Sequence, residues 1–250
     1  LGASTDEAQE RAGIAVAVSV RKALSGELVP DAVNVKGGEI HEEIRPTLPL
    51  VEKMAQIATG FEAELPVSIE ITVKGEVSVY DSSILATSAL KGALIAIGTE
   101  DATYVNSPNL AQEKGMSATV TSEAECADYR SMICLRAAFS NGARVEVDAT
   151  LMGIRKVEKI IRINKFDIEL PPSDHLLFLI YEDKPGVVGA VGNILGAAKI
   201  NIANMQVARD KAGGEALMAL TVDSAIPIEF TEKIAKEVGA RVSRSVSLLV

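Results

Sequence analysis

Apolar positions near the start of the chain predict a helix over residues 5–25. Ser4-Thr5-Asp6-Glu7 is typical of a capping box at a helix start, and Gly26 suits the left-handed position after a helix end. Residues 13–20 are apolar on every face, and such a helix needs cover all round. Because the chain begins at Leu1 without a Met, we expect a fragment of a longer chain, whose helix packs on an absent part or on another subunit.

The next part of the chain, from residue 39 to residue 170, mixes helical and strand periods. Helical spacing covers residues 42–61, closed by Gly60, then a stretch capped by Asp81-Ser82, and a short stretch after Pro108. Asn141-Gly142 joins two alternating runs, which is the strongest short-range signal of a β-hairpin. Strand-like runs occupy 67–73, 116–121, 131–139, 143–149, 160–163 and 166–170. These patterns predict an α+β domain with a mostly antiparallel sheet.

Two prolines, Pro171-Pro172, separate this domain from a last unit. An apolar run at 176–180 leads through a turn into a helix, followed by two strands, a helix and a strand. This βαββαβ order predicts a ferredoxin-like fold. With Gly37 and Gly38 interpreted as a hinge, the predicted organisation is 1–38, 39–170 and 171–250.

Composition and charge narrow the classes of partner. Asp and Glu number 34 against 25 Lys and Arg, for a net charge of -9, which argues against a nucleic-acid partner. Cys126 and Cys134 have a spacing that fits neither a zinc site nor a disulfide framework, so we expect a reduced, cytoplasmic protein without a metal. No apolar stretch reaches the ~20 residues of a membrane span, and no membrane association is expected.

Three segments carry a resemblance to a known family. Residues 179–189 (LIYEDKPGVVG), followed by Asn201-Ile202, resemble an ACT domain. With residues 1–9 (LGASTDEAQ) and 80–92 (YDSSILATSALKG), the whole chain resembles the C-terminal half of long-form D-3-phosphoglycerate dehydrogenases. The resemblance implies a remnant of the catalytic region at 1–38, an intervening domain that binds substrate-like anions, and an ACT domain that senses L-serine and joins subunits into a homo-oligomer.

The same resemblance indicates what this chain lacks. In the family, the NAD-binding domain and the catalytic histidine precede the segment that starts here, and no G-x-G-x-x-G motif follows a strand in this sequence. We therefore expect no cofactor in this chain and no dehydrogenase activity from it alone. For His41 and His175 we expect surface or structural roles.

The predicted effector site lies around the turn at residues 181–186. Gly186 at a helix start leaves N–H groups for a carboxylate, and Asp183 suits an ammonium group. The family's effector contacts match Tyr181, Asp183 and Asn201. We place Asn201 at the start of the neighbouring strand and expect it to reach the ligand across or beside a dimer interface. The alternative is that Asp183 only caps the helix and Asn201 serves a strand edge. Lys199 stands where the family often has a glycine.

The intervening domain carries a weaker prediction. Lys159 matches a lysine that the family places around a phosphate-sized anion, whereas Glu169 falls where an arginine is often found. Lys165 either replaces a missing basic residue or is an ordinary solvated lysine. Asp81-Ser82-Ser83 forms either an anion nest or a helix cap. The rival to a serine sensor is an oligomerisation module whose ACT domain binds no ligand.

Overall fold

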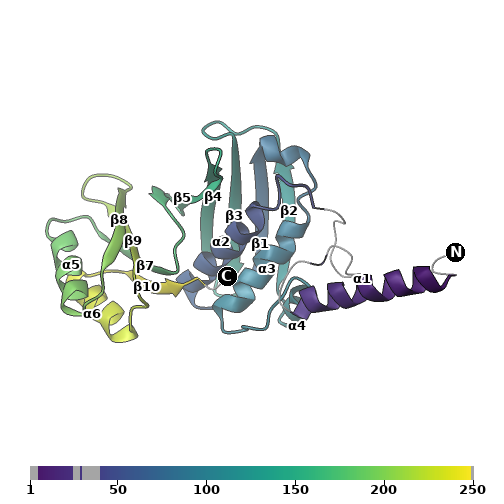
Figure 1. Ribbon diagram of the computed structural model, residues 1–250. Helices are drawn as coiled ribbons and strands as arrows, with labels where there is room; N and C mark the ends of the chain where they lie inside the picture. The colour runs from purple at the N-terminus through teal and green to yellow at the C-terminus, as the bar shows by residue number, and fades with distance from the viewer. Residues whose placement is uncertain (1–4, 25–28, 30–39, 249–250) are drawn as a thin grey trace.

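The computed structural model describes residues 5–24, 29 and 40–248. The predicted hinge at Gly37 and Gly38 and the first predicted domain boundary lie outside these residues. Within them, no helix is long and apolar enough to cross a membrane. Figure 1 shows helix α1 (Asp6–Leu24) and two α+β units in contact with each other.

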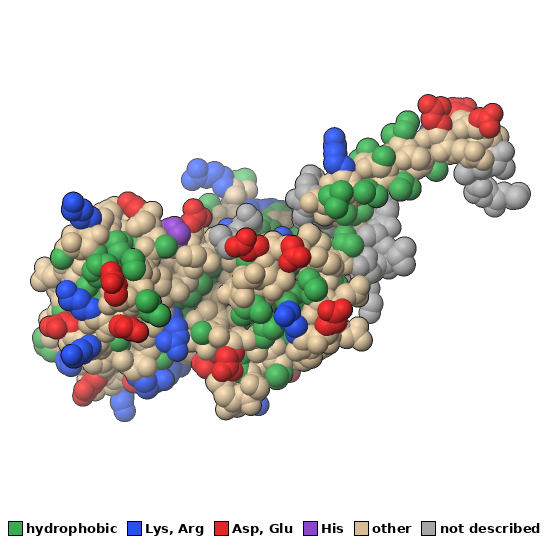
Figure 2. All heavy atoms as spheres, turned by 90° about the horizontal axis from the view of Figure 1, so that it is seen from below, with side chains coloured by type: hydrophobic (Ala, Val, Ile, Leu, Met, Phe, Trp, Pro, Cys, Tyr) green, Lys and Arg blue, Asp and Glu red, His purple; other side chains and the backbone are tan. Residues whose placement is uncertain are grey.

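Helix α1 begins where the sequence predicts it. The Thr5 hydroxyl accepts a hydrogen bond from the Ala8 N–H at 3.2 Å, as a capping residue does. None of its residues is buried, and Figure 2 shows apolar side chains along it. Ile14, Val16 and Val20 are each more than half exposed. The all-round apolar pattern is therefore left uncovered in the isolated chain.

The first unit is a six-stranded sheet with helices on one face. Its sheet order is β2-β1-β3-β4-β5-β6, and only the β1–β2 pair is parallel. The predicted α+β class with a mostly antiparallel sheet is therefore confirmed. The elements are α2 (Thr47–Glu62), β1 (Pro66–Gly75), η1 (Glu76–Val79), α3 (Ile84–Ala96), α4 (Ser107–Glu113), β2 (Ser117–Glu123), β3 (Ser131–Phe139), β4 (Arg144–Met152), β5 (Val157–Ile163) and β6 (Phe166–Leu170).

The hairpin between β3 and β4 forms at the predicted turn. Gly142 has φ +84°, and the Asn141 side-chain oxygen accepts a hydrogen bond from the Ala143 N–H at 2.8 Å. The register pairs Ala138 with Arg144. This register turns the alternate apolar positions of both strands toward the helices α2 and α3, where the buried core lies.

A buried polar cluster joins α2, α3 and the loop that precedes α4. Glu52 on α2 is 2% exposed and pairs with the Lys91 ammonium on α3 at 2.8 Å. The Tyr104 hydroxyl donates a hydrogen bond to the same carboxylate. Burial, together with the charge of Glu52, raises the pKa of Tyr104, which stays neutral. Gly92 permits the close crossing, because a Cβ there would lie 2.2 Å from the Glu52 carbonyl oxygen.

The second unit has the predicted βαββαβ order. Its sheet order is β10-β7-β9-β8, with α5 and α6 packed on one face. This is the ferredoxin-like arrangement. The elements are β7 (His175–Glu182), α5 (Val187–Ala197), β8 (Ile202–Arg209), β9 (Glu215–Val222), α6 (Ile228–Val238) and β10 (Val242–Ser247).

The other face of this sheet packs on the first unit. In β7, Leu177 and Leu179 belong to the core under α5 and α6, whereas Phe178 belongs to the core shared with the first unit. The Phe178 and Phe61 rings have centroids 4.9 Å apart. Strand β7 is a continuous apolar run because both of its faces are buried.

Helix α2 does not end at Gly60, contrary to the sequence prediction. It continues to Glu62, and Ala63 takes the left-handed position after the helix end with φ 58°. Gly60 instead faces the second unit, because a Cβ at this position would lie 2.7 Å from the Val246 Cγ2 atom on β10. The glycine therefore serves a close contact between two units rather than a helix end.

Candidate functional site

The predicted effector loop joins β7 to α5. The Asp183 N–H donates a hydrogen bond to the Gly214 carbonyl oxygen at 2.8 Å, which ties the loop to the β8–β9 turn. The Asp183 carboxylate lies 3.3 Å from the Arg209 guanidinium, and its side chain is 20% exposed. The N-cap residue of α5 is Gly186, and no side chain forms a capping hydrogen bond at the start of this helix. The alternative in which Asp183 caps the helix is therefore not seen.

Arg209 lies beside the predicted loop, although the sequence did not single it out. It ends β8, where it pairs with Ala216, and Ala216 pairs in turn with Tyr181 on β7. In a ferredoxin-like sheet the third strand lies between the first and the second, and the first two strands end at the same edge of the sheet. The predicted strand order could therefore have placed Arg209 near the loop.

The loop places one anionic group, Asp183, and a helix start beside the cationic Arg209 at the end of β8. Gly186 has φ +91°, a left-handed conformation that favours glycine, and the first N–H groups of α5 follow it. Tyr181 lies beneath the loop and is 3% exposed. Its pKa is raised, first by burial and then by the nearby charge of Asp183. This arrangement offers separate places for a carboxylate and an ammonium group.

Asn201 lies at the other end of the sheet, which corrects the predicted placement. Strand β8 is not a neighbour of β7, because β9 lies between them. Ile202, next to Asn201, pairs with Val222, whereas Asp183 lies beyond the opposite end of β9 near Glu215. Seven residues of strand separate the two ends, roughly 20 Å at about 3.3 Å per residue. Asp183 and Asn201 of one chain therefore do not meet at one ligand.

The Asn201 side chain has a local partner. Its amide donates a hydrogen bond to the Asp223 carboxylate at 2.8 Å, and the side chain is exposed. Lys199, just before it, has φ 58°. The position requires the left-handed conformation, which explains why a glycine suits it, and here a lysine adopts it.

The two lysines predicted for an anion lie apart on the first unit. Lys159 stands opposite Thr150 in the β4–β5 pairing. Lys165 lies in the turn after β5 and pairs with Asp210 at 2.9 Å and Glu215 at 2.8 Å on the second unit. These carboxylates raise the pKa of Lys165, and Lys165 lowers the pKa of both carboxyls. Lys165, whose side chain is 49% exposed, therefore links the two units at the surface.

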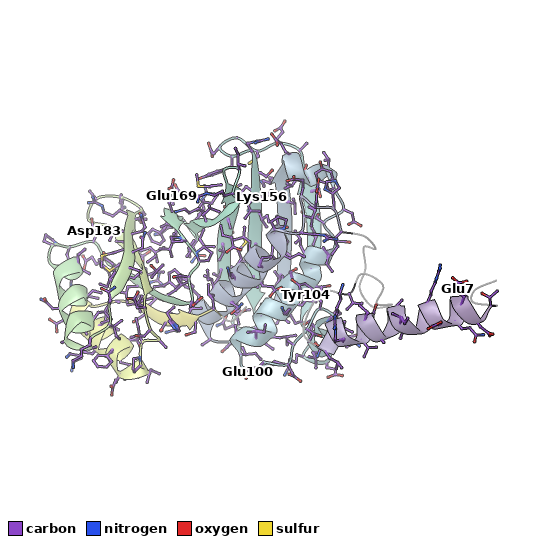
Figure 3. All side chains as sticks on the ribbon, viewed as in Figure 1. Glu7, Glu100, Tyr104, Lys156, Glu169 and Asp183 are labelled. Atoms are coloured by element: carbon purple, nitrogen blue, oxygen red, sulfur yellow. The ribbon has the colours of Figure 1, made fainter. Side chains whose placement is uncertain are left out.

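The surroundings of Glu169 are acidic. A cavity of about 770 Å³ lies beside β6, and its lining includes Glu169 and Asp167 with Lys74 and Arg162. Five carboxylate residues line it in all, namely Glu123, Glu125, Asp128, Asp167 and Glu169. Figure 3 marks Glu169 on the first unit. Five carboxylates against two cations disfavour an anion at this place.

The remaining predicted residues have structural contacts. The Asp81 carboxylate accepts a hydrogen bond from the Ser83 N–H at 2.9 Å in a turn just ahead of α3, and no side chain caps that helix. The His41 ring stacks on Tyr80, with centroids 3.7 Å apart. His175 on β7 lies 3.2 Å from the Ser247 hydroxyl on the adjacent strand β10.

Comparison with known proteins identifies both units. Residues 43–164 match the D-3-phosphoglycerate dehydrogenase intervening domain, and residues 175–239 match the ACT domain. The chain is 41% identical over 248 residues to a D-3-phosphoglycerate dehydrogenase of Mycobacterium leprae, covering 99% of this chain and 47% of that protein.

More distant dehydrogenases of the same name align over the same extent. The identity is 32% over 251 residues for Synechocystis, with 99% of this chain and 45% of that protein covered. It is 31% over 240 residues for Bacillus subtilis, with 95% and 44% covered. The chain thus spans about half the length of the curated relatives that it matches.

Proposed function

The chain belongs to the D-3-phosphoglycerate dehydrogenase family, whose C-terminal half it fits, and on that premise we propose that it senses L-serine through its ACT domain. In this proposal it is the regulatory and oligomerisation part of an NAD-dependent, cytoplasmic enzyme of L-serine biosynthesis. The nucleotide-binding and catalytic residues belong to a part of the enzyme outside this chain.

The observation that carries the proposal is the Asp183–Arg209 pair beside the start of α5. An α-amino acid brings an ammonium group, which Asp183 attracts, and a carboxylate, which the helix N–H groups and Arg209 attract. Both charges of the ligand therefore find partners in this loop and at the adjacent end of β8. A side chain as small as that of serine suits a loop whose base is closed by the buried Tyr181.

A second copy completes the site in this proposal. Strand β8 is an edge strand, and it runs from the Asn201 end of the sheet to the Arg209 end. If two β8 edges pair antiparallel, the start of one strand meets the end of the other. Asn201 of a second copy then approaches Arg209 and Asp183 of the first. Serine binding and homo-oligomer formation would be linked, because each ligand contacts two subunits.

A phosphorylated, substrate-like anion in the intervening domain has less support. Lys165 is already paired with Asp210 and Glu215, and Glu169 adds negative charge beside the other candidate region. We keep Lys159 as the residue to test, with phosphate as the probe. The ACT loop remains the principal site of the proposal.

The test is calorimetric titration of the chain with L-serine, joined to sedimentation at several protein concentrations. We expect saturable binding that tightens the dimer. Asp183→Asn should weaken serine binding about 10-fold to 100-fold, since a charged hydrogen bond contributes about 1.5 to 3 kcal/mol. Asn201→Ala should weaken binding about 5-fold or more by leaving a polar ligand group unpaired.

Two matched variants serve as controls. Asp101→Asn and Asn109→Ala change exposed residues of the same types on the first unit and should leave serine binding unchanged. The rival is an oligomerisation module that binds no ligand. It predicts a dimer dissociation constant that serine does not change, and no heat of binding at millimolar serine. That outcome would contradict the sensor proposal.

A further inference from the structure

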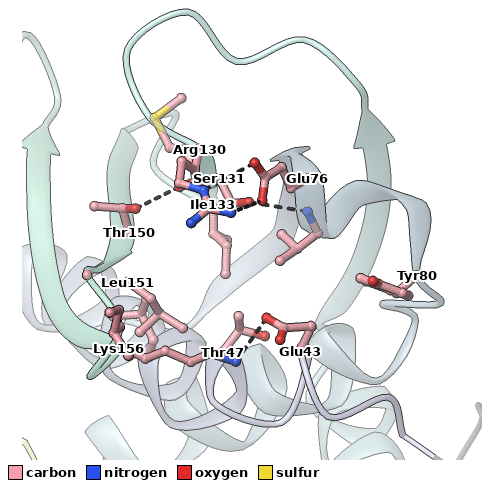
Figure 4. A pocket seen from close by; sticks show the side chains of 15 residues that line it. Glu43, Thr47, Glu76, Tyr80, Arg130, Ser131, Ile133, Thr150, Leu151 and Lys156 are labelled. Atoms are coloured by element: carbon pink, nitrogen blue, oxygen red, sulfur yellow. Dashed lines mark hydrogen bonds and ion pairs between the residues drawn. The ribbon is translucent and has the colours of Figure 1, made fainter.

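A second cavity, apart from the ACT loop, lies at one end of the six-stranded sheet. It has a volume of about 480 Å³ and opens where η1, the start of α2, the start of β3 and the β4–β5 turn meet (Figure 4). Lys156 lines this cavity, and Figure 3 labels Lys156 on the first unit and Asp183 on the second. The volume is within the range of sites that bind small molecules.

Two ion pairs stand at the rim of the cavity. Arg130 binds Glu76 with both Nη2 at 2.7 Å and Nε at 3.1 Å, and Lys156 binds Glu43 at 2.9 Å (Figure 4). Each pair joins two different elements. Lys156 lowers the pKa of Glu43, and Glu76 raises the pKa of Arg130. The rim therefore presents two cations and two anions.

The backbone at Lys156 is unusual for a lysine. Its φ is +49°, at the end of a turn in which its N–H donates to the Gly153 carbonyl oxygen at 3.0 Å. Glycine and asparagine adopt this left-handed conformation more readily than lysine. A lysine at this position costs backbone strain but carries an ammonium group to the cavity rim.

Much of the cavity floor is apolar, although Thr47 and Thr150 also line the cavity. The apolar part includes Leu50 and Ile133, which are at most 3% exposed, together with Val77 and Leu151. A charged rim above an aliphatic floor is complementary to a ligand with a charged head and an aliphatic tail.

We propose that this cavity binds an α-amino acid with an aliphatic side chain. A simple anion would bring a negative charge beside Glu43 and Glu76, and a simple cation would bring a positive charge beside Arg130 and Lys156. A zwitterion adds no net charge. Its carboxylate can pair with a cation of the rim, and its ammonium group can pair with a carboxylate of the rim. Its side chain covers the floor, which removes apolar surface from water.

The test uses L-leucine as the probe, followed by calorimetry and NMR chemical shifts. We expect saturable binding with shifts at Ile133 and Leu151. 4-Methylpentanoate lacks the ammonium group, and 3-methylbutylamine lacks the carboxylate, so each should bind about tenfold or more weakly. Absence of saturable leucine binding, or equal binding of either half-ligand, would overturn the proposal.

Variants separate this site from a structural role and from the ACT loop. Lys156→Asn places a residue that suits the turn, so the fold should be at least as stable while leucine affinity falls about tenfold. Arg130→Gln should weaken leucine binding similarly. Arg136→Gln breaks a comparable exposed pair with Glu146 outside the cavity lining and should have no effect.

Asp183→Asn should leave leucine binding unchanged, so failure of the serine proposal does not decide this one. If Asp183→Asn abolishes leucine binding, the amino acid occupies the ACT loop and the second site is wrong. If Arg136→Gln weakens binding as much as Arg130→Gln, the rim charges are not specific and the proposal also fails.

Discussion

Gly60→Ala is a sensitive probe of the contact between the two units. The new methyl group would lie 2.7 Å from Val246 Cγ2 and 3.2 Å from Cγ1, whereas carbon atoms pack at about 3.5 to 4.0 Å. Val246 is 5% exposed and β-branched, so its side chain has little freedom to turn aside. The substitution therefore pushes β10 away from α2.

The expected size follows from two opposed effects. Alanine in a helix interior gains about 1 kcal/mol over glycine. Overpacking a filled contact costs about 1 to 3 kcal/mol. Gly60→Ala should therefore lower the free energy of unfolding by about 1 kcal/mol. Val246→Ala should cost about 1.6 kcal/mol, since it removes two buried methyl groups at about 0.8 kcal/mol each.

The double variant tests the contact most clearly, because the effect of Gly60→Ala on the free energy of unfolding should change sign. With Val246→Ala in place, the methyl group at residue 60 has room, so Gly60→Ala should then raise the free energy of unfolding by up to about 1 kcal/mol. Urea unfolding of the four proteins measures this cycle. Gly192→Ala on α5 is the control and should stabilise, because no atom lies within 4 Å of its added Cβ. If Gly60→Ala stabilises the unchanged protein as the control does, the contact between the units is wrong.

Two other perturbations have defined outcomes. Gly92→Ala should cost about 3 kcal/mol in urea unfolding, because its Cβ would lie 2.2 Å from the backbone oxygen of Glu52 and two helices must separate. Lys165→Met should raise the pKa of Asp210 and Glu215 toward ordinary values in NMR titrations, and unchanged pKa values would contradict the pairing. Because both pKa values are depressed in the folded state, their stabilising contribution is complete above about pH 4 to 5 and is lost as the pH falls through them. Thermal unfolding should therefore show a smaller loss of melting temperature on acidification in Lys165→Met than in the unchanged chain.

The secondary structure followed from local sequence wherever the determining contacts are local. Asn141-Gly142 fixes the β3–β4 hairpin by its own turn conformation, and the βαββαβ order follows from the alternation of periods in the second unit. Gly60 is the counterexample. A glycine near a helix end usually marks the end, but this one meets Val246, which is distant in sequence.

The site was predictable in part for the same reason. Asp183 and Gly186 are neighbours in sequence, and the loop brings them together. The positions of Arg209 and Asn201 depend on strand order, which places one at the Asp183 end of the sheet and the other at the opposite end. Lys165 has no local feature that indicates its two partners on the second unit.

The most direct test of the proposed sensor is a mixture of two defective chains. Asp183→Asn and Asn201→Ala should each bind L-serine poorly alone. If each site uses Asp183 of one copy and Asn201 of another, a hybrid dimer of the two variants contains one intact site. Hybrids form about half of the dimers in an equal mixture of a twofold-symmetric protein, so calorimetry should recover about a quarter of the sites of the unchanged chain at full affinity. A mixture that binds no better than the separate variants would contradict a site shared between copies.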